Sequence, residues 1–323
     1  MVYFKFPFSE NICTTDSSST KKWVSFFSFD GSEILPFEGD IKQISQQEFL
    51  KNEINTHFLS FNLNGFEEEN QKDYQEKLAN VIGFIKQNNL SKLVISRREL
   101  LNYNGLKINL TQTFLNLCKS YPNAFVYFFI KEGKCWMGAF SEILGKFNKK
   151  NSQFETMSLA GTISVNDNWT KKEIEEQKPV TNFIRNVLGK FSENMEQSET
   201  YDHVSGNIKH LRTDFKAQIT QENLENIISE LHPTPAVCGI PKDLCQNAIE
   251  QFEKYPRKLY AGYIKVETEE YIQYFVNLRC AEFFKNAALI YVGGGITAES
   301  SVEKEWQETE LKAEAILKNV AFI

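Results

Sequence analysis

Short apolar segments with the character of β-strands follow one another along the chain, and their order constrains the fold most. Near the C-terminus, the segments 258–266, 271–284 and 287–296 are rich in β-branched and aromatic residues. Earlier, 124–130 and 134–140 flank a short turn as the two strands of a hairpin would. Because helices do not alternate strictly with these strands, the order favours an α+β fold with large antiparallel sheets.

Helical patterns lie between the groups of strands. In the first of them, five apolar residues recur at helical spacing, namely Tyr74, Leu78, Val81, Ile82 and Ile85. Further helices are expected over 111–119, from about Lys171, over 242–254 and over 301–320, and further strands over 92–96, 154–162 and 203–219. Pro179 should kink its helix because it removes a backbone N–H. Residues 192–202 and 231–241 are expected to be loops, and no second core boundary is visible, so 1–323 is interpreted as one domain.

Charge and cysteine content exclude several classes of function. The chain has 36 Lys and Arg against 42 Asp and Glu, and it lacks the basic stripe that nucleic-acid binding requires. No segment approaches the roughly 20 apolar residues of a membrane span, and the N-terminus has no signal-peptide pattern. The six cysteines are scattered without a CxxC pair, which is typical of reduced cytosolic thiols. We therefore expect a cytoplasmic protein that binds neither nucleic acid nor a membrane.

Two pairs of glutamates stand three residues apart on expected helices. They are Glu173 with Glu176 and Glu305 with Glu308. This spacing places both members of a pair on one helix face, and two such faces could bind a hard cation through oxygen ligands. On residues alone, ordinary interpretations are favoured: a capping box of Thr170 with Glu173, and a surface ion pair of Glu308 with Lys312.

Other residues could carry chemistry but also have structural interpretations. Lys92 begins an apolar strand, where burial would make its amine a base, although a lysine at a strand end usually reaches water. Glu142 follows a strand among apolar neighbours and could keep its proton as an acid, or could simply lie on the surface. Gly293-Gly294-Gly295 could bring backbone N–H groups to an anion or could form a turn. His232, between leucine and proline, has a structural hydrogen bond as its default role.

Ten segments, in order, resemble those of the chorismate-utilising enzymes, which include isochorismate, salicylate, anthranilate and aminodeoxychorismate synthases. KLVISR is similar to the family's KVVLSR, WMGAFSE to GASPE, SLAGT to LAGT and KKEIEEQ to KExxEH. The others are HVSGNIKHLRTDF, LHPTPAV, RKLYAGYI, VNLRCA, GGGI and EWQETELK. The resemblance covers about 75–323, so we expect 1–74 to be a shortened N-terminal part of the same domain. It implies two large, mostly antiparallel sheets packed together and flanked by helices.

The resemblance also implies a chemistry with chorismate as substrate and Mg²⁺ as cofactor. Lys92 would be the base that activates water for attack at ring carbon 2, and Glu142 the acid that protonates the hydroxyl leaving carbon 4, with His232 near that hydroxyl. Glu176 and Glu308 would ligate Mg²⁺ directly, supported by Glu173 and Glu305. The residues implied to contact the substrate are Ala160, Gly161, Thr162, Tyr260, Arg279, Gly293, Gly295 and Lys312. Whether the protein is a monomer or a homodimer stays open.

One position separates the branches of this family. Ala160 stands where aminodeoxychorismate synthases carry a nucleophilic lysine, and SLAGT differs from the PIAGT of anthranilate synthases. Water is therefore the favoured nucleophile, and isochorismate synthase is the favoured activity, in menaquinone or siderophore biosynthesis. A salicylate synthase, which eliminates pyruvate afterwards, and a non-catalytic chorismate-binding protein are the alternatives. Phe140 and Ser141 in the GASPE-like turn, and Gln177 in place of histidine, depart from the family pattern.

Overall fold

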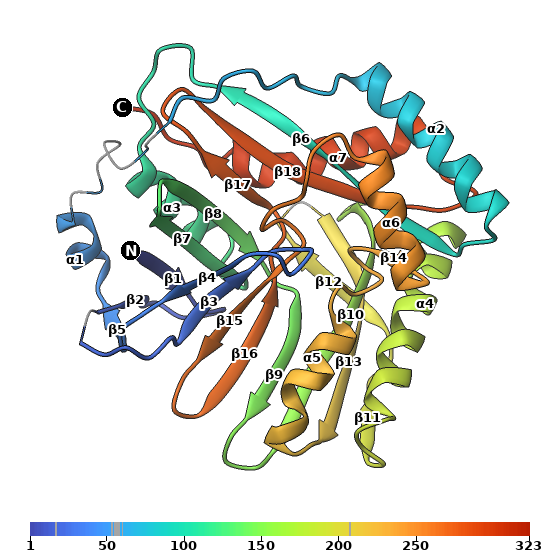
Figure 1. The fold of residues 1–323 in the computed structure, drawn as a ribbon, viewed down its shortest axis with the longest axis horizontal. Coiled ribbons are helices and arrows are strands. Elements are labelled where there is room, and N and C mark those ends of the chain that lie inside the picture. The colour runs from blue at the N-terminus through green and yellow to red at the C-terminus, as the bar shows by residue number, and fades with distance from the viewer. Residues whose placement is uncertain (17, 53, 55–58, 60, 207) are drawn as a thin grey trace.

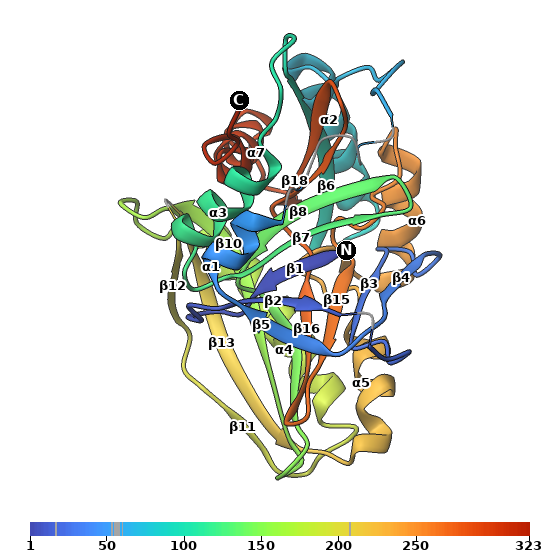
Figure 2. The ribbon, with the colours of Figure 1, turned by 90° about the vertical axis from the view of Figure 1, so that its left-hand side faces the viewer.

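Two large antiparallel sheets form the centre of the molecule (Figures 1 and 2). The computed structural model describes residues 1–16, 18–52, 54, 59, 61–206 and 208–323. In spatial order, the first sheet consists of β14 (Gly239–Ile240), β6 (Lys92–Asn102), β18 (Ala287–Ile296), β17 (Cys280–Phe283), β8 (Lys134–Phe140), β7 (Phe125–Lys131), β1 (Val2–Lys5), β2 (Ile12–Thr15) and β5 (Ile41–Ile44). The predicted hairpin is confirmed, because β7 pairs with β8.

The second sheet is built from groups of strands that alternate along the chain with groups of strands of the first sheet. In spatial order it consists of β11 (Met195–Gln197), β13 (Ile208–Gln218), β10 (Gln153–Ser164), β9 (Ile143–Asn148), β16 (Tyr271–Val276), β15 (Tyr263–Glu267), β3 (Val24–Phe27) and β4 (Ile34–Phe37), with β12 (Tyr201–Ser205) also paired to β13. The predicted α+β class with two large antiparallel sheets is therefore confirmed.

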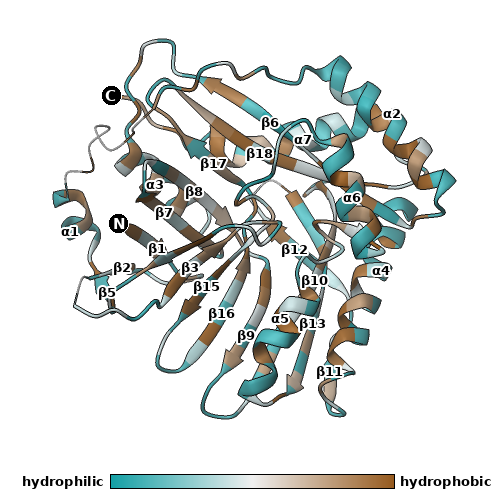
Figure 3. Ribbon diagram, in the orientation of Figure 1, coloured by the Kyte–Doolittle hydropathy of each residue, from teal (hydrophilic) through white to brown (hydrophobic). Residues whose placement is uncertain are grey.

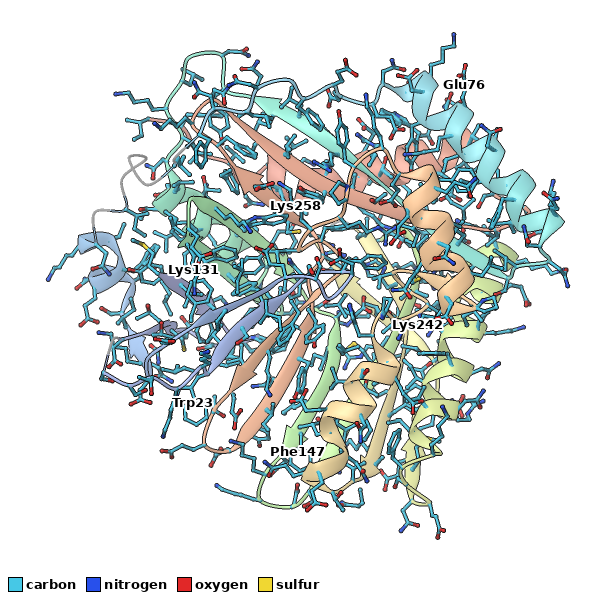
Figure 4. All side chains as sticks on the ribbon, viewed as in Figure 1. Trp23, Glu76, Lys131, Phe147, Lys242 and Lys258 are labelled. Carbon is cyan, nitrogen blue, oxygen red and sulfur yellow. The ribbon has the colours of Figure 1, made fainter. Side chains whose placement is uncertain are left out.

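Helices cover the sheets from several sides. They are α1 (Gln46–Lys51), α2 (Gln71–Gln87), α3 (Leu110–Ser120), α4 (Lys171–Leu188), α5 (Leu224–Leu231), α6 (Lys242–Phe252) and α7 (Val302–Leu317). One hydrophobic cluster joins α1, α3 and α7 to a face of the first sheet, and another joins both sheets to α2, α4, α5 and α6. Figure 3 shows hydrophilic residues on the outer turns of α2, where Glu76 points away from the protein in Figure 4. In the described part of the chain, no helix has the length and apolar character to cross a membrane.

The structure corrects three of the predicted elements. The expected loop 192–202 contains β11 and the start of β12, and the expected strand 203–219 is a pair of strands, β12 and β13. The expected strand 271–284 also divides: β16 belongs to the second sheet and β17 to the first. The chain crosses between the sheets at 277–279, where Arg279 has a positive φ of 46°. A pattern of apolar residues continues through such a crossing, so periodicity alone does not reveal it.

Candidate active site

A cavity lies where β6 and β18 of the first sheet face the end of β10 in the second. The space between its atoms amounts to about 760 Å³, a figure that includes solvent at its open mouth. Residues predicted from sequence that line it are Lys92, Glu142, Ala160, Gly161, Thr162, Glu176, Tyr260, Arg279, Gly293, Gly295 and Lys312. These side chains come from segments more than 200 residues apart in the chain, so the fold gathers most of the expected site.

Lys92 lies at the floor of this cavity and does not reach bulk water. Its side chain is 3% exposed, and Nζ contacts Glu176 Oε1 at 2.7 Å. Gly295 on β18 makes room for this pair: a Cβ atom there would overlap Lys92 Cε and lie 2.5 Å from Glu176 Oε1. The interpretation of Lys92 as a solvent-reaching lysine is therefore wrong, and glycine at position 295 has a steric reason.

The packing at Gly295 predicts a measurable cost. Gly295→Ala should lower the free energy of unfolding by about 1–3 kcal/mol, because the added methyl group forces the buried Lys92–Glu176 pair to move. Gly83→Ala on α2 is the control: a Cβ there meets no atom within 4 Å, and alanine favours a helix over glycine by up to ~1 kcal/mol. Urea unfolding of both variants measures the difference. Equal stability of Gly295→Ala and the wild type would show that the pair is not confined.

Glu142 lies between β8 and β9 and is also buried. Burial raises the pKa of its carboxyl to about 7, and the charges of Lys92, Arg279 and Lys312 oppose this rise only in part. Its surface interpretation is therefore wrong, since the side chain lines the cavity with 5% of its surface exposed. Near neutral pH the group can hold a proton and release it, which is what a general acid must do.

The raised pKa of Glu142 has a consequence for stability. A carboxyl whose pKa is higher in the folded than in the unfolded chain stabilises the fold below its unfolded pKa, and this contribution disappears as pH rises through the folded pKa. With 4.5 and about 7 as the two values, the wild type should lose about 2–3 kcal/mol relative to Glu142→Gln between pH 5 and pH 8. Urea unfolding of both proteins at the two pH values tests this. Parallel stability curves would contradict a raised pKa.

Arg279 is held at the cavity wall by a chain of hydrogen bonds. Its Nη2 lies 2.7 Å from His210 Nε2, and His210 Nδ1 lies 3.0 Å from the carbonyl oxygen of Gly161. Since the guanidinium must donate, His210 Nε2 accepts and Nδ1–H donates, as a neutral imidazole can. Burial, followed by the charges of Arg279 and Lys312, lowers the pKa of His210 well below its usual value. Arg279 also donates to Ser205 Oγ, so its guanidinium is fixed from two sides.

Two histidines bear on the site: His210 was missed by sequence reasoning, and His232 was predicted to lie near the leaving hydroxyl. His210 lines the cavity from β13, one residue before Leu211, which pairs with Ala160. His232 is absent from the cavity lining; its Nε2 lies 3.2 Å from the Phe29 carbonyl oxygen and its ring packs on Tyr263. In this structure His232 therefore makes a hydrogen bond with the backbone, as histidines commonly do. Pairing across strands, which decides the place of His210, leaves no local pattern in the sequence.

Three of the four predicted metal-site glutamates gather around Lys172. The distances from Lys172 Nζ are 2.9 Å to Glu305 Oε1, 3.9 Å to Glu176 Oε2 and 4.0 Å to Glu308 Oε2. We call these four residues the Lys172 cluster. The fourth glutamate, Glu173, instead accepts hydrogen bonds from the backbone N–H and Oγ1 of Thr170. The capping box is thus observed for Glu173, which stands apart from the other three glutamates.

The chemistry of the Lys172 cluster fits a hard cation. Glu305 is 1% exposed, and its Oε2 has no hydrogen-bond partner among the described residues. Burial and then the charge of Glu308 raise the pKa of Glu305 to about 7, which marks a carboxylate short of positive charge. In the described ranges, no group of three or more His, Cys, Asp or Glu residues is arranged to hold a metal, and the Lys172 ammonium lies among these three carboxylates. The three carboxylates supply suitable oxygen ligands for Mg²⁺ once that ammonium moves away.

Comparisons with known proteins point to one family. A family model described as chorismate binding enzyme matches residues 32–321. Isochorismate synthase 2, chloroplastic, of Arabidopsis thaliana is 38% identical over 115 residues, which are 35% of this chain and 20% of that protein. Isochorismate synthase EntC of Escherichia coli (strain K12) is 28% identical over 203 residues, which are 58% of this chain and 51% of that protein. The matches thus span between a fifth and half of these relatives.

A solved structure shares the whole architecture. MenF, the menaquinone-specific isochorismate synthase from Escherichia coli, superposes with a TM-score of 0.78 and 18% identity, covering 98% of this chain and 88% of that one. At this identity the likeness shows the fold. The two-sheet arrangement described above is therefore one that solved proteins adopt.

Proposed function

The chain belongs to the family of chorismate-binding enzymes, and on that premise we propose that it is an Mg²⁺-dependent isochorismate synthase. The observation that carries the proposal is the pairing of two buried groups on one cavity: the amine of Lys92 and the carboxyl of Glu142, whose pKa lies at about 7. A protein that only binds its ligand needs neither a confined amine nor a carboxyl that keeps its proton. This arrangement supports an enzyme rather than a binding protein.

The proposed reaction moves a hydroxyl group around the ring of chorismate. Lys92 takes a proton from a water molecule, whose oxygen bonds to ring carbon 2. The ring double bonds shift, the bond from carbon 4 to its hydroxyl breaks, and Glu142 protonates that hydroxyl so that it leaves as water. One water enters and one departs, so product and substrate are isomers. Lys92 can take this proton only as a neutral amine, because an ammonium has no lone pair; the ammonium that contacts Glu176 must therefore first release a proton to solvent.

The rest of the cavity suits a substrate with two carboxylates. Arg279 and Lys312 supply positive charge at the wall, and Arg279 can bind a carboxylate through two parallel hydrogen bonds. Glu176, Glu305 and Glu308 would hold Mg²⁺, which when bound supplies Lewis-acid compensation of a ring carboxylate. Ala160 lines the cavity with no amine of its own, which supports water as the nucleophile. Menaquinone biosynthesis is one proposed pathway for the product, and siderophore biosynthesis is the other.

Glu142→Gln tests the acid role. The amide keeps the size of the side chain but cannot release a proton of suitable acidity, so turnover of chorismate should fall at least ~100-fold. Glu155→Gln is a matched control, because Glu155 on β10 is partly exposed. Its sole ion pair in the described structure is a loose one with Lys146, at 3.9 Å. Chromatography of the product measures both variants. A loss of less than ~10-fold for Glu142→Gln would mean that another group protonates the leaving hydroxyl.

The product distinguishes the proposed function from its alternatives. Purified protein with chorismate and Mg²⁺ should form isochorismate and release no pyruvate. Salicylate together with pyruvate would identify a salicylate synthase, and thermal stabilisation by chorismate without turnover would identify a binding protein. Either outcome would overturn the proposal.

A further inference from the structure

Lys172 occupies the position in which a cation would meet all three carboxylates of the Lys172 cluster. It projects from the first turn of α4, one turn before Glu176, and reaches across to Glu305 and Glu308 on α7. Its side chain is 22% exposed, whereas that of Glu305 is 1% exposed. The ammonium therefore lies on the solvent side of the glutamates and has a route away from them.

The carboxylate oxygens of the cluster contact three different lysines. Lys92 Nζ holds Glu176 Oε1 at 2.7 Å, and Lys312 Nζ holds Glu308 Oε1 at 2.7 Å. Lys172 faces the other oxygen of each of these carboxylates, Oε2, and also Glu305 Oε1. Three ammonium groups thus face three carboxylates, and they offset part of the negative charge of the cluster.

A divalent ion and the Lys172 ammonium cannot share this position. An ion held by these carboxylates would lie beside the oxygens that now face Lys172, and two cations a few ångströms apart in a partly buried site repel strongly. The unpartnered Oε2 of Glu305 shows that the ammonium leaves one ligand unused, as a single point charge on one side of the cluster would. Lys172 has a flexible stem of four carbons that can turn toward water.

We propose that Lys172 is a resident counter-ion of the Mg²⁺ site, which stabilises the metal-free enzyme and must be displaced when the metal binds. The inference rests on the proposed Mg²⁺ site and adds to it that this side chain lowers metal affinity. Lys172 thereby acts on the metal through competition and takes no part in the chemistry of the substrate.

Calorimetric titration with MgCl₂, in the absence of chorismate, tests the proposal. Lys172→Met removes the charge and keeps the length of the side chain, so it should bind Mg²⁺ at least ~10-fold more tightly than the wild type. Lys171→Met is the matched control, because Lys171 is an exposed neighbour on the same helix, and it should bind as the wild type does. Equal or weaker binding by Lys172→Met, with a wild type that binds Mg²⁺, would overturn the inference alone. An absence of binding in all three proteins would overturn the Mg²⁺ site as well.

A measurement on the wild type covers the case in which Lys172→Met fails to fold. Lysine acetylation, followed by peptide mass spectrometry, reports how accessible each amine is. With saturating MgCl₂, Lys172 should react several-fold faster than in EDTA, while Lys171 should react at the same rate in both. Unchanged or slower acetylation of Lys172 with Mg²⁺ would contradict displacement.

Discussion

Lys92→Ala should lower turnover of chorismate at least ~1,000-fold, within the range of 10²–10⁴ for removing a positioned general base. No second amine replaces it, because Lys312 and Lys172, the other lysines of the site, hold Glu308 and Glu305. Substrate affinity should change much less than turnover, since Arg279 and Lys312 remain at the cavity wall. Product chromatography measures the rate, and calorimetry with chorismate measures binding.

The control for Lys92→Ala must separate chemistry from folding. Removing Lys92 leaves Glu176 without the ammonium at 2.7 Å, and an unpaired buried charge costs several kcal/mol. Circular dichroism must therefore show a folded variant before its rate is interpreted. Lys146→Ala, which removes a surface lysine 3.9 Å from Glu155, should leave both rate and fold unchanged. Turnover of folded Lys92→Ala within ~10-fold of the wild type would remove Lys92 from the base role.

Removal of Mg²⁺ should stop the reaction, with a fall of at least ~100-fold in EDTA and full recovery on adding excess MgCl₂. A Lewis acid contributes several kcal/mol to such a reaction, and the Lys172 ammonium cannot replace a divalent charge on the substrate. EDTA saturated beforehand with Mg²⁺ controls for effects of the chelator itself. An unchanged rate in EDTA would discredit the metal site.

A pair of variants on α7 locates the metal. Glu308→Gln should raise the Mg²⁺ concentration needed for half-maximal rate, because it removes one charged ligand from the Lys172 cluster. Glu303→Gln, on the same helix but exposed to solvent, should leave that concentration unchanged. The same metal requirement in both variants would place the ion elsewhere.

The elements that could be predicted from sequence are those with strong local patterns. The apolar spacing from Tyr74 to Ile85 predicts a helix, and α2 follows at Gln71–Gln87. The N-terminal strands β1 to β5 were not foreseen, because each has only four residues and periodicity needs longer runs. The family model nevertheless extends back to residue 32, earlier than the resemblance from about 75.

Site residues could be predicted where their own segment carries the signal, and were missed where pairing across the fold decides. Lys92 begins and Glu142 follows an apolar segment that resembles a family motif, and both residues line the cavity. Lys172 lies next to Glu173 in the sequence, but only the fold shows that it also faces Glu305 and Glu308 on α7. Glu173 shows the converse: the capping box and the metal role fit the same spacing, and local hydrogen bonds to Thr170 prevail. The residues that line the cavity were therefore easier to predict from sequence than the residues that contact them.

The origin of the product hydroxyl tests the central claim most directly. When chorismate and Mg²⁺ are incubated with the protein in H₂¹⁸O, the mass spectrum of the product should show isochorismate carrying one ¹⁸O atom at carbon 2. This result requires water to enter at one ring position while the original hydroxyl leaves from another. Isochorismate without the label, or no isochorismate from folded, Mg²⁺-loaded protein, would contradict the account.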